Sequence, residues 1–449
     1  MDPGCILFIM SEHVGHINAS FGLARRLQQR GHNVAYVGSG ASSSLITDQG
    51  FVFERVSCLQ PLPVPRLKML RILVGRRRPP SVDWSELLGR MQREVKELIL
   101  NFSPRLLIFD PFLLLYYMAF WPHRVPAAVL SANMPLDYDP AVPPYTSSVI
   151  PSQSRWSRVR VWWAWQSAFC RYAIHRLCCR AQLLLEGNSS FRLARTVAAE
   201  FDFPLENERI YRPVSFDFCL RSVPELVLSI PGFDFPRALP IRQAVQFIGP
   251  AIHLGRNEPE FDWSILPNRP FLVYASLGTI ELPWLLPRRE AFLRTVINAF
   301  RTLDDCSLLI ACGASTSVAT FDPLPRNVAV VHVAPQLRVL RRATLFLSHA
   351  GANSVKESIL LGVPLLVYPR RADQPGNAAR VVFHGLGLRG DPDRETAVGL
   401  AQKVRRILGN PEYRENVGRM RSAFLDSEAD EQGVLTVESL FGSTNTHAS

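Results

Sequence analysis

This sequence lacks a long apolar run and grouped cysteines, and two of its basic segments lack any acidic residue. The longest apolar stretch, PFLLLYYMAFW, is well short of the roughly 18–20 residues that a helix needs to cross a bilayer. The early run CILFIM follows no basic residues and is too short for the core of a signal peptide. We therefore expect a cytoplasmic protein with neither a secretory leader nor a membrane-spanning helix.

Metal sites built on cysteine are also not expected. The eight cysteines are scattered, and none forms a Cys-x-x-Cys pair with histidines nearby. Scattered thiols in a large chain are typical of a reducing compartment. His13 and His16 are three residues apart, but the sequence suggests no third ligand. We predict no metal and no cofactor.

The net charge of +11 is concentrated in two places. Residues 66–78 and 155–180 each carry six basic residues and no acidic one, which accounts for the whole excess. Two interpretations stay open: solvated surface elements, or attraction to an anionic membrane surface or ligand. No recognised nucleic-acid module is present, so nucleic acid is not a predicted partner.

The length of 449 residues exceeds one typical core and predicts two domains. In both halves, short apolar runs alternate with helical patterns, which indicates parallel sheets covered by helices. A stretch near residue 250 is rich in Pro, Gly and Asn and breaks this alternation. We predict a first domain over 1–249, a linker over 250–268, a second domain over 269–425, and a C-terminal helix and tail over 426–449 that packs back on the first domain.

Two predicted helix starts carry polar residues. A helix over 17–30, closed by Gly31, leaves His16 just before its first turn. A second helix begins near Asn353, a good N-cap residue, directly after the strand TLFLS. Gly351 in the intervening turn lets the backbone approach a ligand closely.

The second helix start has the features of an anion site. Its free N–H groups and dipole favour negative charge, and ligands of open α/β sheets bind at this edge. His349 can donate to a phosphate oxygen, and Glu357 on the same helix face as Asn353 can reach ribose hydroxyls. Asp373 and Gln374 follow the next strand and can bind sugar hydroxyls. This order predicts a nucleotide sugar. The alternative is an ordinary capped turn with acidic residues on the surface.

A catalytic base is predicted in the first half of the chain. An acceptor hydroxyl is a poor nucleophile near neutral pH and needs a base. His16 precedes a helix, whose N-terminus would help to keep the imidazole neutral. Asp110 ends a different strand and could orient that imidazole. The alternative for His16 is a loop or capping histidine.

Several motifs, taken together, resemble one family. HAGANSVKE, then GVP and ADQPGN, resemble the signature of the UDP-glycosyltransferases, family one of the glycosyltransferases. VAPQLRVL, SLGT, DPF and the opening GHIN are similar to further family motifs in the same order. The resemblance is strongest to the bacterial macrolide and zeaxanthin branch. It implies the α/β GT-B fold, in which two Rossmann-like domains face each other, the first binding the acceptor and the second the nucleotide sugar.

The resemblance also implies roles for residues. It assigns His16 as base and Asp110 as its partner, an in-line displacement with inversion, and no metal. For the donor site it implies that His349, Asn353 and Ser354 bind the diphosphate beside the Gly351 turn, and that Ser276, Gly278 and Thr279 close on it. Glu357 would hold the ribose, and Asp373 and Gln374 would hold the sugar. Gln336 would lie near the nucleoside, with Val333 at the position beside the base. Plant members carry a tryptophan where Val333 stands, and Val333 cannot stack on a base. Ala19 replaces the proline of the family's GHxxP loop.

The predicted function is transfer of a hexose, with glucose favoured by the Asp-Gln pair, from a UDP-sugar to a hydroxyl of a hydrophobic small molecule. The acceptor classes are polyketides, terpenoids or carotenoids, and phenolics. The alternatives are a dTDP-deoxysugar transferase, a nucleotide-sugar epimerase of the same fold, and a non-catalytic nucleotide-sugar-binding protein. The tryptophan-rich segment 155–180 would line the acceptor pocket, lie on an anionic membrane as a peripheral contact, or form a core helix with a basic outer face.

Overall fold

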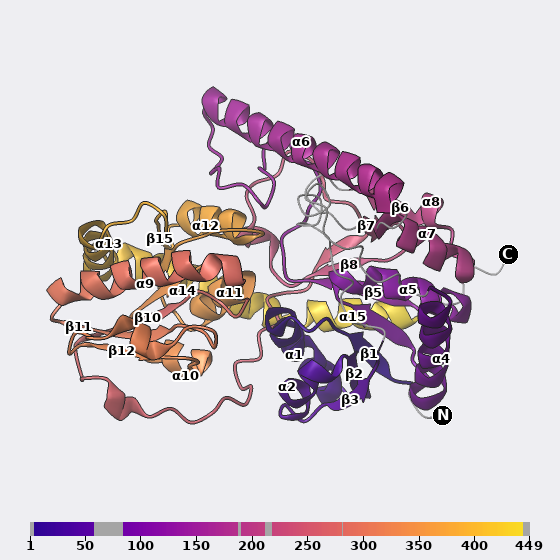
Figure 1. The fold of residues 1–449 in the computed structure, drawn as a ribbon, viewed down its shortest axis with the longest axis horizontal. Helices are drawn as coiled ribbons and strands as arrows, with labels where there is room; N and C mark the ends of the chain where they lie inside the picture. The colour runs from indigo at the N-terminus through magenta and orange to yellow at the C-terminus, as the bar shows by residue number, and fades with distance from the viewer. Residues whose placement is uncertain (1–3, 58–83, 187–189, 212–217, 281, 443–449) are drawn as a thin grey trace.

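The structure is a computed structural model that describes residues 4–57, 84–186, 190–211, 218–280 and 282–442. The basic segment 66–78 and the residues after 442 lie outside this part of the chain. Figure 1 shows two α/β units side by side, with one long helix along the outer edge.

The first unit is built on a seven-stranded sheet in the order β3-β2-β1-β4-β5-β8-β9, with every neighbouring pair parallel. Its strands are short and mostly buried, as expected when helices cover both faces. They are β1 (Ile6–Ile9), β2 (Val34–Gly38), β3 (Val52–Arg55), β4 (Leu106–Phe109), β5 (Ala127–Ser131), β8 (Glu225–Val227) and β9 (Val245–Phe247). A small antiparallel pair, β6 (Arg209–Tyr211) and β7 (Phe218–Leu220), lies apart from it.

The helices of this half connect the strands. They are α1 (Val14–Gln29), α2 (Ser43–Thr47), α4 (Trp84–Phe102), α5 (Leu114–Phe120), α6 (Arg155–Glu186), α7 (Ser190–Glu200) and α8 (Leu205–Glu208). The predicted strand–helix alternation is confirmed here, although the short β8 and β9 have no strong sequence signal.

The second unit repeats the architecture with six parallel strands in the order β12-β11-β10-β13-β14-β15. These strands are β10 (Phe271–Ser276), β11 (Cys306–Ala311), β12 (Val328–Val331), β13 (Leu345–Ser348), β14 (Leu365–Val367) and β15 (Gly387–Arg389). Its helices are α9 (Leu286–Ala299), α10 (Gln336–Leu340), α11 (Ala352–Leu360), α12 (Gln374–Phe383), α13 (Ala397–Gly409) and α14 (Glu412–Ala429).

Both sheets reverse their winding at one point, between β1 and β4 in the first and between β10 and β13 in the second. Such a switch point opens a crevice at the carboxyl ends of the strands, where ligands of doubly wound sheets bind. The prediction of two Rossmann-like domains is therefore confirmed, and each domain offers one candidate crevice.

The last helix, α15 (Gln432–Gly442), returns to the first unit and packs against α1 (Figure 1). Val434 and Val437 are fully buried in the same core cluster as β1. On the surface, the Arg30 side chain donates to Glu438 at 2.8 Å. These contacts fasten the end of the chain to the domain in which it began.

Buried polar contacts also join the two units. Arg380 on α12 donates to Asp234 Oδ1 at 2.5 and 3.1 Å, and both side chains are buried. Lys356 on α11 donates from Nζ to the Leu228 carbonyl, just after β8, at 3.0 Å. A buried charge without a partner is costly, so these pairs favour one relative placement of the domains.

Two helix starts differ from the sequence prediction. Helix α1 begins at Val14 with His13 as N-cap, so His16 lies inside the first turn and not before the helix. Helix α11 begins at Ala352, and its N-cap is Gly351 rather than Asn353. Gly351 already has the extended backbone of an N-cap residue, and the Asn353 amide reaches across to the Gly15 carbonyl of the other unit instead of capping its own helix.

Candidate active site

His16 and Asp110 meet at the switch point of the first sheet. His16 comes from α1, which follows β1, and Asp110 directly follows the neighbouring strand β4. His16 Nδ1 lies 2.8 Å from Asp110 Oδ2, so Nε2 is left for a ligand. The Ser11 hydroxyl donates to the same oxygen at 2.8 Å, and the Phe112 N–H donates to Oδ1 at 2.9 Å. Asp110 is completely buried, whereas the His16 side chain keeps 28% of its surface exposed.

The carboxylate decides the charge preference of the pair. Burial alone would lower the pKa of His16, but the charge of Asp110 and its hydrogen bond raise that pKa above the ordinary value. The carboxylate therefore outweighs burial in setting the pKa of His16. The pKa of Asp110 is lowered, because His16 and three hydrogen bonds outweigh the effect of burial. Asp110 stays ionised and can stabilise the imidazolium that forms when His16 takes a proton.

The pair predicts a pH effect. A protonated His16 cannot accept a proton, so kcat/KM should rise with pH through the raised pKa of His16, above its ordinary 6.5. Asp110→Asn removes the carboxylate charge that raises the pKa of His16. In this variant the rise of the residual kcat/KM with pH should therefore occur at lower pH. If kcat/KM of Asp110→Asn rises at the same pH as in the original chain, a group other than His16 controls the rise.

Two aromatic rings border the base. His13 and Phe112 have ring centroids 5.5 and 5.1 Å from His16. Burial and the neighbouring His16 lower the pKa of His13, so its ring is neutral near pH 7. Phe112 is half exposed. These rings give the surroundings of His16 an apolar side, which suits an acceptor with an apolar body.

In the second unit, two glycines enclose His349. Ser276 and Ser348 end adjacent strands in register, and the turns after them carry Gly278 and Gly351. A Cβ atom at Gly278 would lie 2.6 Å from His349 Nε2, and one at Gly351 would lie 2.5 Å from it. No side chain fits at either position without displacing the ring. The glycines of the SLGT and HAG motifs thus serve to hold the imidazole in place.

His349 is neutral here. Burial, with the nearby charge of Arg289, lowers the pKa of His349 to about 4. It can therefore donate a hydrogen bond but carries no positive charge near pH 7. The cations of this region are Arg289, whose guanidinium donates to the Gly278 carbonyl at 3.4 Å, and Arg371, which acts electrostatically on both His349 and His13.

The first turn of α11 lies beside His349 and faces the first unit. Its leading N–H groups have no partners within the helix, and the Ala352 N–H donates to Asp373 Oδ2 at 3.3 Å. Asn353 donates to the Gly15 carbonyl, one residue before His16. Asp373 is close enough to His16 to help raise its pKa. The base and the helix terminus therefore share one interdomain site.

Glu357 is held by protein groups on both oxygens. It is 1% exposed, accepts from Arg256 Nη1 at 2.5 Å, and accepts from Gln336 Nε2 at 2.6 Å. Arg256 also pairs with Glu258, which accepts from the first N–H groups of α10. Gln336 and Ser354 are in contact at 3.5 Å. Each carboxylate oxygen of Glu357 thus already accepts a hydrogen bond from a protein donor. A ribose hydroxyl could donate only to the lone pairs that remain on these oxygens.

Arg256 should therefore tune donor affinity. Arg256→Gln removes the cation that fixes Glu357, and loss of such a charged hydrogen bond is expected to raise the donor KM about tenfold with little change in kcat. Arg338→Gln is the matched control, because Arg338 pairs with the exposed Glu260 at 2.9 Å. Calorimetric titration with UDP and dTDP checks this. Equal affinities of the two variants would remove Arg256 from the donor site.

The remaining predicted donor residues are less engaged. Gln374 Oε1 accepts from the N–H groups of Arg370 and Arg371 and so braces its own loop, which leaves its amide nitrogen for a ligand. Thr279 and Val333 are exposed at the edge of the site. Their predicted roles stay predictions.

Sequence reasoning missed Arg256, Arg289 and Arg371. Arg371 had a weak signal, since it stands two residues before Asp373 in the ADQPGN motif region. Arg256 lies in the predicted linker and Arg289 in a helix with several basic residues. Neither position has a spacing that marks it.

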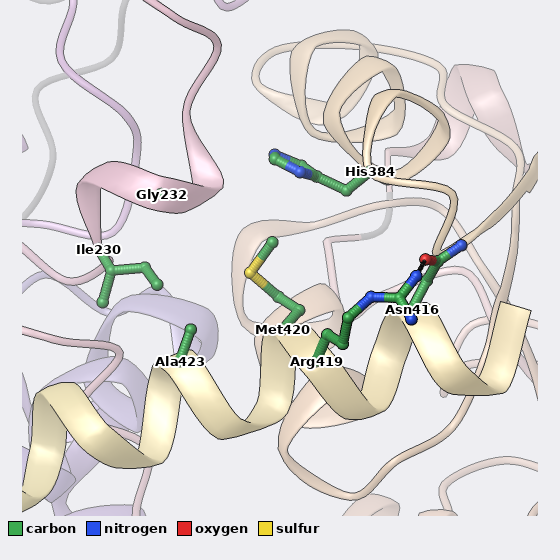
Figure 2. Close-up of a pocket in the computed structure, with 7 residues that line it drawn as sticks. All are labelled: Ile230, Gly232, His384, Asn416, Arg419, Met420 and Ala423. Carbon is green, nitrogen blue, oxygen red and sulfur yellow. Dashed lines mark hydrogen bonds between the residues drawn. The ribbon is translucent and has the colours of Figure 1, made fainter.

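Within the described ranges, no group of three or more His, Cys, Asp or Glu side chains is placed to hold a metal ion. No helix of the described chain is long and apolar enough to cross a membrane. A pocket of about 210 Å³ lies elsewhere, between α14 and the turn at 230–232, and Figure 2 shows Met420 and Arg419 on its helical wall. None of the residues assigned to the active site lines it.

Comparisons with known proteins agree with this geometry. Residues 295–434 match the family model of the erythromycin biosynthesis protein CIII-like C-terminal domain. The chain is 29% identical over 207 residues to the zeaxanthin glucosyltransferase of Pantoea ananas, an alignment that covers 46% of each chain. It is 27% identical over 278 residues to the NDP-glycosyltransferase YjiC of Bacillus licheniformis, covering 56% of this chain and 67% of that one.

Over these regions the chain is similar to glycosyltransferases of the bacterial macrolide and zeaxanthin branch. The alignments span only about half to two thirds of these curated relatives. The likeness in fold extends over nearly the whole length of the chain. The crystal structure of the kitacinnamycin glycotransferase superposes with a TM-score of 0.63 at 22% identity, covering 98% of this chain and 99% of that one. The predicted GT-B fold is thus correct.

Proposed function

We propose that this protein transfers a hexose from a nucleoside diphosphate sugar to a hydroxyl group of a hydrophobic small molecule, with inversion at the anomeric carbon. The observation that carries the proposal is the shared interdomain site, in which the His16–Asp110 pair faces the first turn of α11. One side supplies a base for an incoming hydroxyl, and the other supplies hydrogen-bond donors for a departing diphosphate.

The reaction proceeds as a single displacement. His16 Nε2 accepts the acceptor's hydroxyl proton as that oxygen forms a bond to the anomeric carbon. The bond from that carbon to the diphosphate oxygen breaks, and its electron pair leaves with the diphosphate. The N–H groups at the start of α11, the His349 ring and the charges of Arg289 and Arg371 stabilise the departing anion. Ionised Asp110 stabilises the resulting imidazolium.

The donor is proposed to be a UDP-sugar, with a dTDP-sugar as the second candidate. Glu357 beside Gln336 suits a ribose with two hydroxyls, which supports UDP. One relative carries zeaxanthin glucosyltransferase as its name, which supports glucose. The exposed Val333 offers no stacking surface for either base, and a solved structure of similar fold is a glycosyltransferase in complex with dTDP, which keeps the second donor in view.

The acceptor is proposed to be apolar, because Phe112 and His13 flank the base and relatives are named for zeaxanthin and oleandomycin. Carotenoid, polyketide and phenolic alcohols belong to this class. A non-catalytic binding protein would have no use for a base paired with a buried carboxylate on the opposite domain.

The test is incubation of the protein with UDP-glucose or dTDP-glucose and a mixed library of apolar alcohols, followed by mass spectrometry. We expect a hexosylated alcohol and free nucleoside diphosphate in equal amounts. An isomerised donor with no product would indicate an epimerase. Binding without turnover of any donor would indicate a binding protein.

A further inference from the structure

Helix α6 presents an apolar stripe to the outside of the molecule. Its buried face is narrow and consists of Val161, Trp165 and Ala168, which pack with Leu136, Tyr145 and Val149. The opposite face carries apolar side chains at spacings of three, four and seven residues, which one side of a helix requires. They are Trp156, Val159, Trp163, Cys170, Ile174 and Leu177.

This stripe is open to solvent among the residues that the structure describes. Trp156 is 78% exposed, and Trp163 and Leu177 are each 62% exposed. Figure 1 shows α6 along the outer edge, away from both sheets. Two large tryptophans with this exposure on one helix face are unusual for a surface in contact with water alone.

Arginines border the stripe on both sides. At 100° per residue, Arg155 falls on one flank of the stripe, and Arg160 and Arg171 on the other, whereas Arg158 and Arg176 lie nearer to the buried face. No acidic residue occurs between 155 and 180, so nothing in this stretch of the helix offsets their charge. An apolar stripe with interfacial tryptophans and flanking arginines is the pattern of a helix that lies in the surface of an anionic bilayer.

We propose that α6 docks the protein on an anionic lipid surface, with its axis parallel to the membrane and its outer tryptophans inserted among the headgroups. The arginines would pair with lipid phosphates at the same depth. A second copy of this chain fits the face less well, because two such helices would bring arginines against arginines with no acid between them. This inference does not depend on the catalytic proposal.

The binding test uses the full chain and two kinds of vesicle, pure phosphatidylcholine and an equimolar mixture with phosphatidylglycerol. We expect cosedimentation with the mixed vesicles only, a blue shift of tryptophan emission, and release by high salt. Trp163→Gln should weaken binding strongly. Replacing Arg160 and Arg171 by glutamine should weaken it roughly fivefold per arginine.

The matched control is Trp284→Gln, since Trp284 is also 62% exposed but lies in the second unit, outside α6. It should bind the mixed vesicles like the original chain. All these residues are on the surface, and equal melting temperatures would show that the variants fold. Failure of the original chain to bind anionic vesicles would overturn the proposal. So would equal loss in Trp163→Gln and Trp284→Gln, or a dimer in solution that Trp163→Gln separates.

Discussion

Replacing His16 with alanine is expected to lower kcat about 10²–10⁴-fold, because positioned general-base catalysis contributes that much and His16 is the imidazole that Asp110 contacts. Donor affinity should change little, since the proposed diphosphate contacts come from the other domain. Asp110→Asn should lower kcat by at least about a hundredfold, because it keeps the shape of the pair but removes the charge that stabilises the imidazolium.

His13→Ala is the matched control for this experiment. His13 is 5.5 Å from His16 between ring centroids, shares its turn, and bonds to Ser11 rather than to Asp110. It should retain most of the turnover. Steady-state kinetics on the three variants, with donor affinity measured separately, checks the assignment. Equal losses in His13→Ala and His16→Ala would mean that the turn, not the base, is required.

Replacing Gly351 with alanine is expected to raise the donor KM about a hundredfold, the scale on which a displacement of about 1 Å acts at a reacting site. The new Cβ would lie 2.5 Å from His349 Nε2, so the ring must move. The effect is steric, because the backbone of Gly351 is in the ordinary extended region.

Gly418→Ala on α14 is its control. Nothing lies within 4 Å of the Cβ position there, and alanine favours a helix over glycine by about 1 kcal/mol. This variant should bind the donor normally and melt at the same temperature or higher. A Gly351→Ala protein that binds UDP and dTDP as well as the original chain would remove His349 from the diphosphate site.

The positions of the candidate site residues in the fold were predicted from the sequence better than the contacts that these residues make. Apolar runs followed by Gly-containing turns locate the ends of β1, β10 and β13, because parallel strands buried on both faces have few other patterns. His349, Gly351 and Asp110 follow such runs directly and lie where predicted. The two helix starts at the site were wrong by one to three residues; at α11, Gly351 already has an extended backbone and Asn353 bonds to Gly15 instead of capping its own helix.

The interactions of Glu357 could not be predicted in the same way. Helical spacing places Glu357 on the face of α11 that carries Asn353. It does not predict that the Arg256 guanidinium, 101 residues away in the chain, binds the Glu357 carboxylate. Likewise, the raised pKa of His16 depends on the buried carboxylate of Asp110, 94 residues further along the chain. Such contacts depend on how two sheets are wound and joined, and no periodicity in the sequence encodes them.

The most direct test of the central claim is the anomeric configuration of the product, measured by proton NMR after transfer from an α-linked nucleoside diphosphate glucose. In the proposed displacement the incoming hydroxyl and the leaving diphosphate lie on opposite sides of the sugar, which predicts a β-linked product. A product with the α linkage would contradict the proposed displacement and the role given to His16.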